Sequence, residues 1–366
     1  MARIGIDATY SVDENAYGIS RYSRRLVESL LTLPSAHQFL ICYRLSRFFR
    51  RKSFTPLAGT GAGRSYFQPP WGWRLPSRLD MFHSLAQRPA PFRFRREVVT
   101  VHDVFPISGK DYSTPAFQRV FSELLMKAVG RAVRVITPSE YTASELVKYG
   151  NVPREKIRVV PEGVDPPLRT MTAGEKHRGR MALLGREGKI LLNVGALQTR
   201  KNLIRCLEAL LRLPKDVFLV LAGGEGHGSE AVHATIHEHG LEGRVRLLGY
   251  VSEGRVEELY EMADILLFPS LEEGYGLPVL EAMAHSLPVV TSSSSALPEV
   301  GGDAALYVNP LEVEDITRKV SAALQDESLR TKLVERGLRR VKGFSWRRAA
   351  EATMQVYDEV LSESSS

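Results

Sequence analysis

Two glutamates frame a glycine-rich turn in the second half of the chain, within the stretch Glu-Glu-Gly-Tyr-Gly-Leu-Pro-Val-Leu-Glu. Glu273 and Glu281 are separated by seven residues, and Gly274 and Gly276 lie between them. Glycine lets a backbone approach a ligand closely, and Pro278 suits the first turn of a helix, whose N–H groups attract anions. We therefore expect an anion site whose flanking carboxylates accept hydrogen bonds from sugar hydroxyls. The alternative is a plain strand–turn–helix with a capping Glu.

Two adjacent cations, Arg200 and Lys201, follow a predicted strand at 190–195. A diphosphate leaving group gains negative charge in the transition state, and fixed cations stabilise that charge without a metal ion. Positive charge at the start of a helix opposes the helix dipole. An anionic ligand explains this placement, whereas the alternative is a pair of ordinary surface charges.

A third candidate lies in the first half, where a predicted strand at 98–103 ends in His102 and Asp103. Ligands of open parallel α/β sheets bind outside the carboxyl ends of the strands. We therefore interpret His102 as a functional residue, the alternative being a structural histidine.

These motifs resemble the GT-B glycosyltransferases of family 4, and the resemblance extends over nearly the whole chain. The segment that starts at Glu273 is similar to the family's Glu-x7-Glu signature, and Arg200 and Lys201 match its Arg–Lys pair. The resemblance implies that Glu273 contacts the hydroxyls of the donor sugar and that Glu281 binds the ribose. It also implies that the amides around Gly276 meet the sugar and the diphosphate, and that the anomeric configuration is retained.

The resemblance assigns roles in the first half as well. His102 and Asp103 are similar to a His-Asp pair of a bacterial, mannose-transferring branch, in which the His reaches the donor sugar and phosphate. Asp103 would orient His102. The loop around Gly18 resembles the family's N-terminal phosphate loop, although Tyr17 stands before it where a second glycine is common, and a plain turn is the alternative.

The predicted site therefore combines residues from both halves of the chain. The candidate catalytic residues are His102, Glu273, Arg200 and Lys201. The candidate binding residues are Gly18, Asp103, Gly195, Gly223, Val251, Gly274, Tyr275, Gly276, Leu277 and Glu281.

The elements that must position these residues alternate between strand and helix. In the first half we expect strands at 4–7, 39–43, 98–103 and 134–137, and helices at 20–31 and after an N-cap at Ser139. In the second half we expect strands at 190–195, 217–222, 245–249, 265–268 and 288–291. This alternation predicts an α/β fold with parallel sheets. With the resemblance, it predicts a GT-B fold, in which two Rossmann-like domains face each other across a cleft.

The predicted domains follow from a change of character near a Pro- and Gly-rich stretch at 161–167. Residues 1–165 would form the acceptor domain and residues 186–342 the nucleotide-sugar domain, with a polar linker between them. Residues 343–361 would form a helix that returns to the N-terminal domain, as the resemblance implies. Residues 44–97 are expected to form long loops with short elements.

The composition excludes several other classes. Cys42 and Cys206 lack metal-type spacing, and the chain contains no Asp-x-Asp motif, so we expect no bound metal and no cofactor beyond the donor. The N-terminus leads straight into a strand, and no apolar run approaches the ~20 residues of a membrane span. We therefore expect a cytoplasmic protein.

The charge is unevenly distributed: residues 1–165 hold 25 Lys and Arg against 14 Asp and Glu, whereas the remainder holds 24 against 28. This asymmetry is compatible with a solvated basic face, with an anionic membrane or acceptor, or with nucleic acid. Nucleic acid is disfavoured because no recognition motif accompanies the charge. Aromatic residues among the arginines favour the inner face of a membrane and a lipid-linked acceptor. These aromatic residues are Phe48, Phe49, Trp71 and Trp73.

The sequence thus predicts a retaining, metal-independent hexosyltransferase of cell-surface polysaccharide synthesis. Its donor would be a nucleotide-diphosphate sugar, with GDP-mannose favoured, and its acceptor a glycan or a lipid-linked glycan. The alternatives are a sugar-nucleotide epimerase on the same fold and a noncatalytic basic membrane-binding module. A dinucleotide dehydrogenase is disfavoured because no Gly-x-Gly-x-x-Gly follows the first strand.

Overall fold

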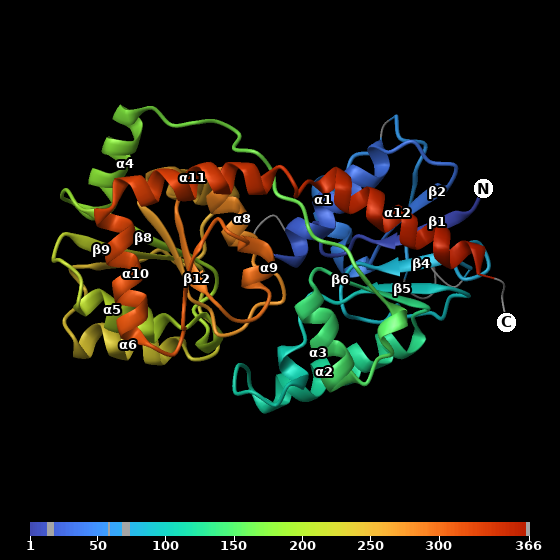
Figure 1. Ribbon diagram of the computed structural model, residues 1–366. Coiled ribbons are helices and arrows are strands. Elements are labelled where there is room, and N and C mark those ends of the chain that lie inside the picture. The colour runs from blue at the N-terminus through green and yellow to red at the C-terminus, as the bar shows by residue number, and fades with distance from the viewer. Residues whose placement is uncertain (13–17, 58, 68–73, 364–366) are drawn as a thin grey trace. The chain divides into compact units, whose positions relative to one another are not determined.

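The computed structural model describes residues 1–12, 18–57, 59–67 and 74–363, and its contacts divide the chain into two compact units (Figure 1). The N-terminal unit comprises Met1–Lys110, Pro115–Gly163 and Phe344–Ser366. The C-terminal unit comprises Asp111–Thr114 and Val164–Gly343. Tyr17, Trp71 and Trp73 lie outside the described residues, as does the side chain of Phe48.

The N-terminal unit is built on a parallel sheet with the strand order β3-β2-β1-β4-β5-β6-β7 in its described part. Its strands are β1 (Arg3–Asp7), β2 (Gln38–Tyr43), β3 (Gly63–Tyr66), β4 (Met81–Ser84), β5 (Glu97–Thr100), β6 (Arg134–Thr137) and β7 (Ile157–Val159). Its helices are α1 (Ile19–Thr32), α2 (Pro115–Arg131), α3 (Glu140–Gly150) and α12 (Trp346–Ser362), with the short 3-10 helices η1 (Leu45–Ser53), η2 (Phe105–Ile107) and η3 (Arg154–Lys156).

The C-terminal unit repeats this plan with the order β10-β9-β8-β11-β12-β13. Its strands are β8 (Lys189–Val194), β9 (Val217–Ala222), β10 (Val245–Leu247), β11 (Ile265–Phe268), β12 (Val289–Ser292) and β13 (Leu306–Val308). Its helices are η4 (Thr199–Lys201), α4 (Ala173–Leu184), α5 (Leu203–Leu211), α6 (Ser229–Glu238), α7 (Glu253–Met262), α8 (Leu277–Ala284), α9 (Leu297–Gly301), α10 (Val313–Gln325) and α11 (Glu327–Val341). The strand order 3-2-1-4-5-6 is that of Rossmann folds, so the predicted α/β class with two Rossmann-like domains is confirmed.

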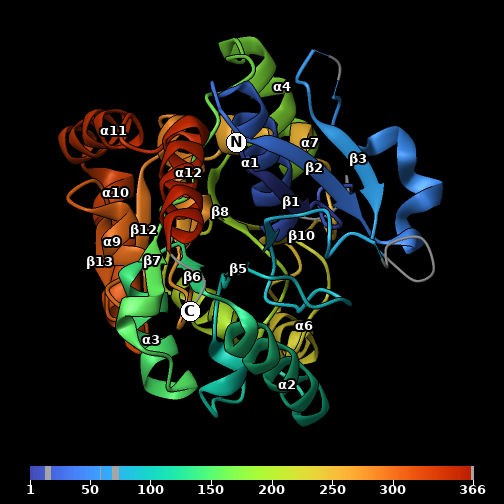
Figure 2. The same ribbon diagram turned by 90° about the vertical axis from the view of Figure 1, so that its right-hand side faces the viewer.

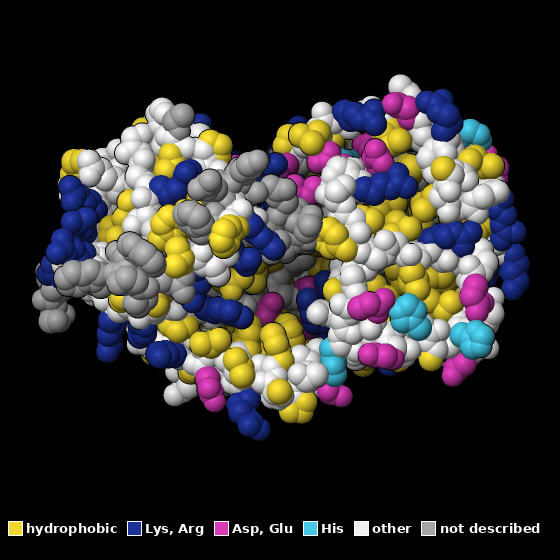
Figure 3. Space-filling model, turned by 180° about the vertical axis from the view of Figure 1, so that it is seen from behind, with side chains coloured by type: hydrophobic (Ala, Val, Ile, Leu, Met, Phe, Trp, Pro, Cys, Tyr) yellow, Lys and Arg dark blue, Asp and Glu magenta, His cyan; other side chains and the backbone are white. Residues whose placement is uncertain are grey.

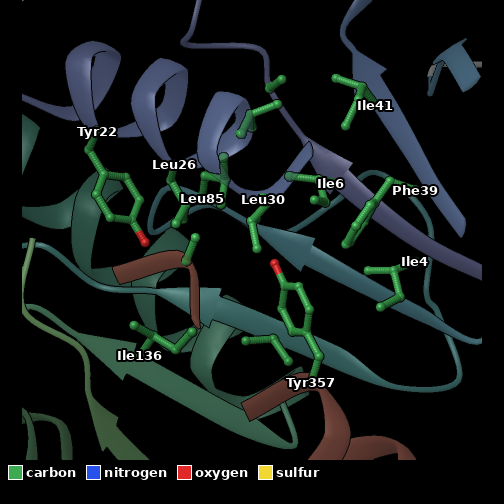
Figure 4. Packing of buried hydrophobic residues seen from close by; sticks show 14 of the residues in the cluster. Ile4, Ile6, Tyr22, Leu26, Leu30, Phe39, Ile41, Leu85, Ile136 and Tyr357 are labelled. Atoms are coloured by element: carbon green, nitrogen blue, oxygen red, sulfur yellow. The ribbon is translucent and has the colours of Figure 1, made fainter. Parts of the chain in front are cut away.

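Helix α12 is part of the N-terminal core although it ends the chain. It packs on α1, and Figures 1 and 2 both show the two helices side by side. Figure 4 shows Tyr22 reaching from α1 and Tyr357 from α12 into one buried layer, with Leu26, Leu30 and Leu85 among the side chains that fill it. The last helix therefore completes the hydrophobic core around the first strands.

A buried polar chain runs through this core. The Tyr357 hydroxyl lies 2.7 Å from His83 Nδ1, and His83 Nε2 lies 2.9 Å from the Thr100 hydroxyl. The Tyr22 hydroxyl lies 3.0 Å from the same Thr100 oxygen. Burial lowers the pKa of His83 to about 3, with a smaller contribution from His102, so the His83 ring stays neutral at ordinary pH.

The stretch expected to be a linker contains a helix. α4 has a capping box between Thr172 and Glu175, and its Arg180 bonds to Met262 and to Asp264, 2.8 Å away. The C-terminal unit consequently starts at Val164 and not at residue 186. Within the expected loop region 44–97, the structure places two strands, β3 and the fully buried β4. No helix in the described part of the chain is both long and apolar enough to cross a membrane.

Candidate functional site

The loop after β8 is held in place by an asparagine. Asn202 follows η4 in the left-handed region, with φ of 61°. Its side-chain amide donates to the carbonyls of Pro269, at 3.0 Å, and Pro310, at 2.7 Å. The backbone N–H of Leu271 donates to the carbonyl of Arg200 at 2.7 Å. These bonds fasten the loop after β8 to the loop after β11, so side chains from both loops meet at the carboxyl ends of adjacent strands.

Glu273 is bound by both cations of the first loop; we call these three residues the Glu273 cluster. Lys201 Nζ lies 2.6 Å from Oε1, and an Arg200 Nη1 donor lies 2.8 Å from Oε2. Lys201 is 7% exposed, and its ammonium lies 4.6 Å from the centre of the Phe268 ring. One carboxylate is thus shared by two cations in a largely water-excluded place.

The cluster keeps Glu273 ionised. Burial disfavours the charged carboxylate, but the nearby Lys201 and Arg200 outweigh it and lower the pKa of Glu273 to about 2. Electrostatic interactions are stronger where water is excluded. A ligand that binds here therefore meets an ionised carboxylate and two cationic side chains.

Three glycines leave the backbone bare around the cluster. A Cβ on Gly223 would lie 1.9 Å from the carbonyl oxygen of Gly195, and a Cβ on Gly195 would lie 3.1 Å from Lys201 Cε. Gly276, the residue before α8, has φ of 113°, and a Cβ there would lie 2.7 Å from Leu297. The structure therefore gives a steric reason for glycine at each of these three predicted positions.

Glu281 lies inside α8 and has a partner that the sequence interpretation missed. The hydroxyl of Tyr260, on α7, donates to Oε2 of Glu281 at 2.7 Å. Both side chains are buried. The Tyr260 ring stacks on His285 with 5.4 Å between centroids. In the sequence, Tyr260 lies among apolar residues of a helix and looks like a core residue. Its hydroxyl is the one feature that could have indicated a polar partner such as Glu281.

The other predicted residues of the C-terminal unit lie at the start of α8 and, in the case of Val251, between β10 and α7. Tyr275 and Leu277 are buried and Gly274 is partly buried at the turn before α8. Val251 is partly buried just before Ser252, the N-cap of α7. The structure thus groups Arg200, Lys201 and Glu273 by direct contact, whereas Glu281 contacts α7.

His102 lies just beyond β5 in the N-terminal unit, within a second ionic pair. Its Nδ1 is 3.1 Å from a carboxylate oxygen of Glu162, and its Nε2 is 2.9 Å from the carbonyl oxygen of Leu85. The ring meets Tyr22 edge-on, with 4.6 Å between centroids. Glu162 belongs to the Pro- and Gly-rich stretch that predicts the domain boundary, and it lies three residues beyond the end of β7 at Val159.

The electrostatics of His102 favour the charged ring. Burial opposes the charge, but the hydrogen bond and the negative charge of Glu162 outweigh it, helped by Leu85 and Asp103, and raise the pKa of His102. Its backbone N–H donates to the side-chain oxygen of Gln87 at 3.3 Å. Asp103 contributes charge to this environment and is partly buried.

Gly18 occupies the position before α1, with φ of 68°. That conformation favours glycine, and the Gly18 carbonyl accepts the hydrogen bond that starts the helix at Tyr22. In the described part of the chain, no group of three or more His, Cys, Asp or Glu side chains is arranged to hold a metal ion.

Two family models match the two halves of the chain. "Glycosyltransferase Family 4" matches residues 18–167, and "Glycosyl transferases group 1" matches residues 182–340. The chain is 30% identical to the O-antigen chain mannosyltransferase B of Escherichia coli, over 96% of this chain and 98% of that protein.

Solved structures share the fold. Sucrose-phosphate synthase from Thermosynechococcus elongatus has a TM-score of 0.75 at 19% identity and covers all of both chains. Anabaena Alr3699/HepE in complex with UDP-glucose has a TM-score of 0.75 at 16% identity, covering 98% of this chain and 100% of that chain. With near-complete coverage of the Escherichia coli relative and both family models matched, the chain belongs to the family 4 glycosyltransferases, which have the GT-B fold.

Proposed function

We propose that the protein transfers mannose, with retention of configuration and without a metal ion, from GDP-mannose to a glycan or lipid-linked acceptor in cell-surface polysaccharide synthesis. The observation that carries this proposal is the Glu273 cluster, in which one buried carboxylate is shared by Arg200 and Lys201. The mannosyltransferase name of the Escherichia coli relative supports the choice of sugar and pathway, and the UDP-glucose complex of the Anabaena protein supports a nucleotide-sugar donor.

The cluster fits a sugar diphosphate by charge. The two phosphates would bind Arg200 and Lys201, which stabilise the charge that grows as the leaving group departs. Glu273, ionised at ordinary pH, would then accept hydrogen bonds from sugar hydroxyls. Glu281, held by Tyr260, would accept hydrogen bonds from the ribose.

The transfer step needs no covalent enzyme intermediate. The bond between the anomeric carbon and the phosphate oxygen breaks, and the acceptor oxygen bonds to that carbon from the same face. The acceptor proton passes to the departing phosphate, which acts as the base. Measurement of the product anomer tests this step, because an inverted product would contradict it.

The donor is tested by thermal unfolding with GDP-mannose, GDP-glucose, UDP-glucose and ADP-glucose, since a ligand that binds only the native protein raises Tm. We expect the largest rise with GDP-mannose, and we expect mannose transfer to a bacterial lipid-linked glycan fraction. Equal Tm values with all four donors, or turnover only with a UDP-sugar, would contradict the donor assignment. Isomerised free donor without transfer would favour an epimerase.

A pocket in the N-terminal unit is suited to the acceptor. It has a volume of about 250 Å³, and Tyr10, Phe117 and Phe121 line it together with Gln87 and Arg88. Aromatic faces pack against the apolar faces of sugar rings, and the polar side chains can bind hydroxyls. Gln87 also contacts the backbone of His102, which connects the pocket to the predicted catalytic residue.

Substitution of Phe117 tests the pocket. We expect Phe117→Ala to raise the KM for the acceptor about tenfold, because a loss of ~1.4 kcal/mol of binding free energy corresponds to a factor of ten. The KM for the donor should not change. Met126→Ala is the matched control, because Met126 is also exposed on α2 but does not line the pocket. Equal effects of the two substitutions would refute the acceptor pocket.

The exposed surface of the N-terminal unit supports a proposed peripheral attachment to the inner face of a membrane. Phe49 on η1 is 94% exposed, between Arg47 and Arg50 in sequence. On the face shown in Figure 3, Lys and Arg side chains stand among hydrophobic ones. We expect sedimentation with phosphatidylglycerol vesicles at low salt, a decrease at high salt, and a decrease with Phe49→Ser. Absence of sedimentation at low salt would refute the attachment.

A further inference from the structure

The His102 ring has acceptors at both of its nitrogens. The carbonyl of Leu85 can only accept a hydrogen bond, so Nε2 carries a proton. The carboxylate of Glu162 lies at Nδ1, and an ionised carboxylate also only accepts. Imidazole is a stronger base than a carboxylate by about two pKa units in water, so the shared proton belongs on the ring.

The surroundings of His102 leave Glu162 as the group that decides this charge. The titratable and charged groups that face the ring are Glu162 after β7, Asp103 beside it, Tyr22 on α1 and His83 on β4. Tyr22 contacts the ring through its edge, and His83 is neutral. Among these groups in the described chain, only the Glu162 carboxylate is hydrogen-bonded to an imidazole nitrogen of His102.

The backbone around Glu162 is fixed by a close crossing of the chain. A Cβ on the next residue, Gly163, would lie 2.2 Å from the backbone nitrogen of Trp346, where α12 begins. Only glycine permits this approach. Glu162 itself is 4% exposed, so its carboxylate is held in the interior beside His102.

We propose that Glu162 is a positioning residue that holds His102 as a doubly protonated cation, whose two N–H groups donate to Glu162 and Leu85, so that this ring supplies positive charge and does not act as a base. The role of His102 toward a donor phosphate rests on the proposed function, but the protonation of the ring does not. A cationic His102 agrees with a transfer step in which the departing phosphate takes the acceptor proton.

The isosteric variant Glu162→Gln separates charge from shape. The Gln amide N–H can donate to Nδ1, so His102 can become a neutral ring that still donates from Nε2 to Leu85. The geometry is then kept while the cation is lost. Glu162→Asp keeps the carboxylate and is the conservative control.

The test is 15N NMR of the histidine rings in the full-length protein at pH 7.5, with His102→Gln to identify the resonances. We expect the imidazolium pattern for His102 in the wild type and in Glu162→Asp, and the neutral Nε2–H pattern in Glu162→Gln. His83 should be neutral in all variants and serves as internal reference. A neutral His102 in the wild type, or a cationic one in Glu162→Gln, overturns the proposal.

Activity gives the second readout. With GDP-mannose, Glu162→Gln should lower kcat about tenfold or more at pH 7.5, with smaller losses at lower pH, where His102 regains its proton. Glu162→Asp should recover most of the wild-type pH profile. A pH-independent loss in Glu162→Gln would refute the positioning role, whereas the absence of turnover in the wild type would refute only the choice of donor.

Discussion

The Glu273 cluster and the His102–Glu162 pair place a buried carboxylate against positive charge beyond the carboxyl ends of parallel strands, yet they differ in kind. In the Glu273 cluster one carboxylate, whose pKa is lowered to about 2, is shared by two cations. In the pair, one carboxylate faces one imidazole that also bonds to a backbone carbonyl. In the first arrangement the two cations can release the carboxylate and bind a phosphate instead. In the second, both ring nitrogens are already hydrogen-bonded, and the charge of the ring depends on Glu162.

The largest effect should come from the cations of the Glu273 cluster. Lys201→Ala should lower kcat for mannose transfer by about 10²- to 10³-fold, as expected for the loss of one preorganised group at a developing charge. Lys189→Ala is the matched control, because Lys189 begins the strand that precedes Lys201 and is half-exposed beside Asp264. Similar kinetics of the two variants would contradict the role of Lys201.

Glu273→Gln should separate anion binding from catalysis. Loss of the carboxylate should lower the free energy of unfolding by about 3 kcal/mol, because two largely buried cations lose a shared partner. The same change should strengthen the binding of pyrophosphate, because pyrophosphate no longer competes with the Glu273 carboxylate for Arg200 and Lys201. The rate of mannose transfer should fall. Calorimetric titration with pyrophosphate measures this, and weaker binding by the variant would contradict exchange at the cluster.

The pair should respond to pH where the cluster does not. The pKa of His102 is raised in the folded protein above its ordinary value of about 6.5. The pair therefore stabilises the fold fully below pH 6.5, and this contribution is lost as the pH rises through the raised pKa. Denaturant unfolding of the wild type should therefore show a decline above pH 6.5 that Glu162→Gln lacks. His83, with a pKa of about 3, affects stability only at lower pH. If the free energy of unfolding fell with pH in the same way in the wild type and in Glu162→Gln, the His102–Glu162 pair would not be the cause of the decline.

The smallest effect should come from a group that supports the cluster indirectly. Tyr260→Phe removes the hydroxyl that donates to Glu281 and should raise the KM for donor about threefold, the value of an ordinary hydrogen bond. kcat should stay within a factor of two. Tyr307→Phe is the control, because its hydroxyl donates to the carbonyl of Gly302 instead. A kcat loss as large as that of Lys201→Ala would mean that Glu281 acts in chemistry.

Local patterns predicted much of the fold. The strand at 134–137 agrees with β6, and the final helix, predicted within 343–361, agrees with α12, because their apolar residues follow the period of a single element. β4 was missed because its four residues are all buried and show no alternation. α4 was missed because it has no clear apolar face, although Thr172 and Glu175 of its capping box are visible in the sequence.

The site was predictable where spacing within one segment carried it. Glu273, Gly276 and Glu281 lie on one turn and helix, whereas His102 and Glu162 are 60 positions apart and meet only through the pairing of β5, β6 and β7. Tyr260 likewise reaches Glu281 from another helix. Such partners depend on tertiary contacts that a single sequence does not display.

The place of α12 in the first core also sets an order for biosynthesis. Tyr357 and Trp346 become available only after the C-terminal unit has left the ribosome. We therefore expect the N-terminal unit to complete its core after the C-terminal unit has been synthesised, against the usual N-to-C order of domain folding. Emergence of α12 should therefore be the event that makes the nascent N-terminal unit resistant to protease.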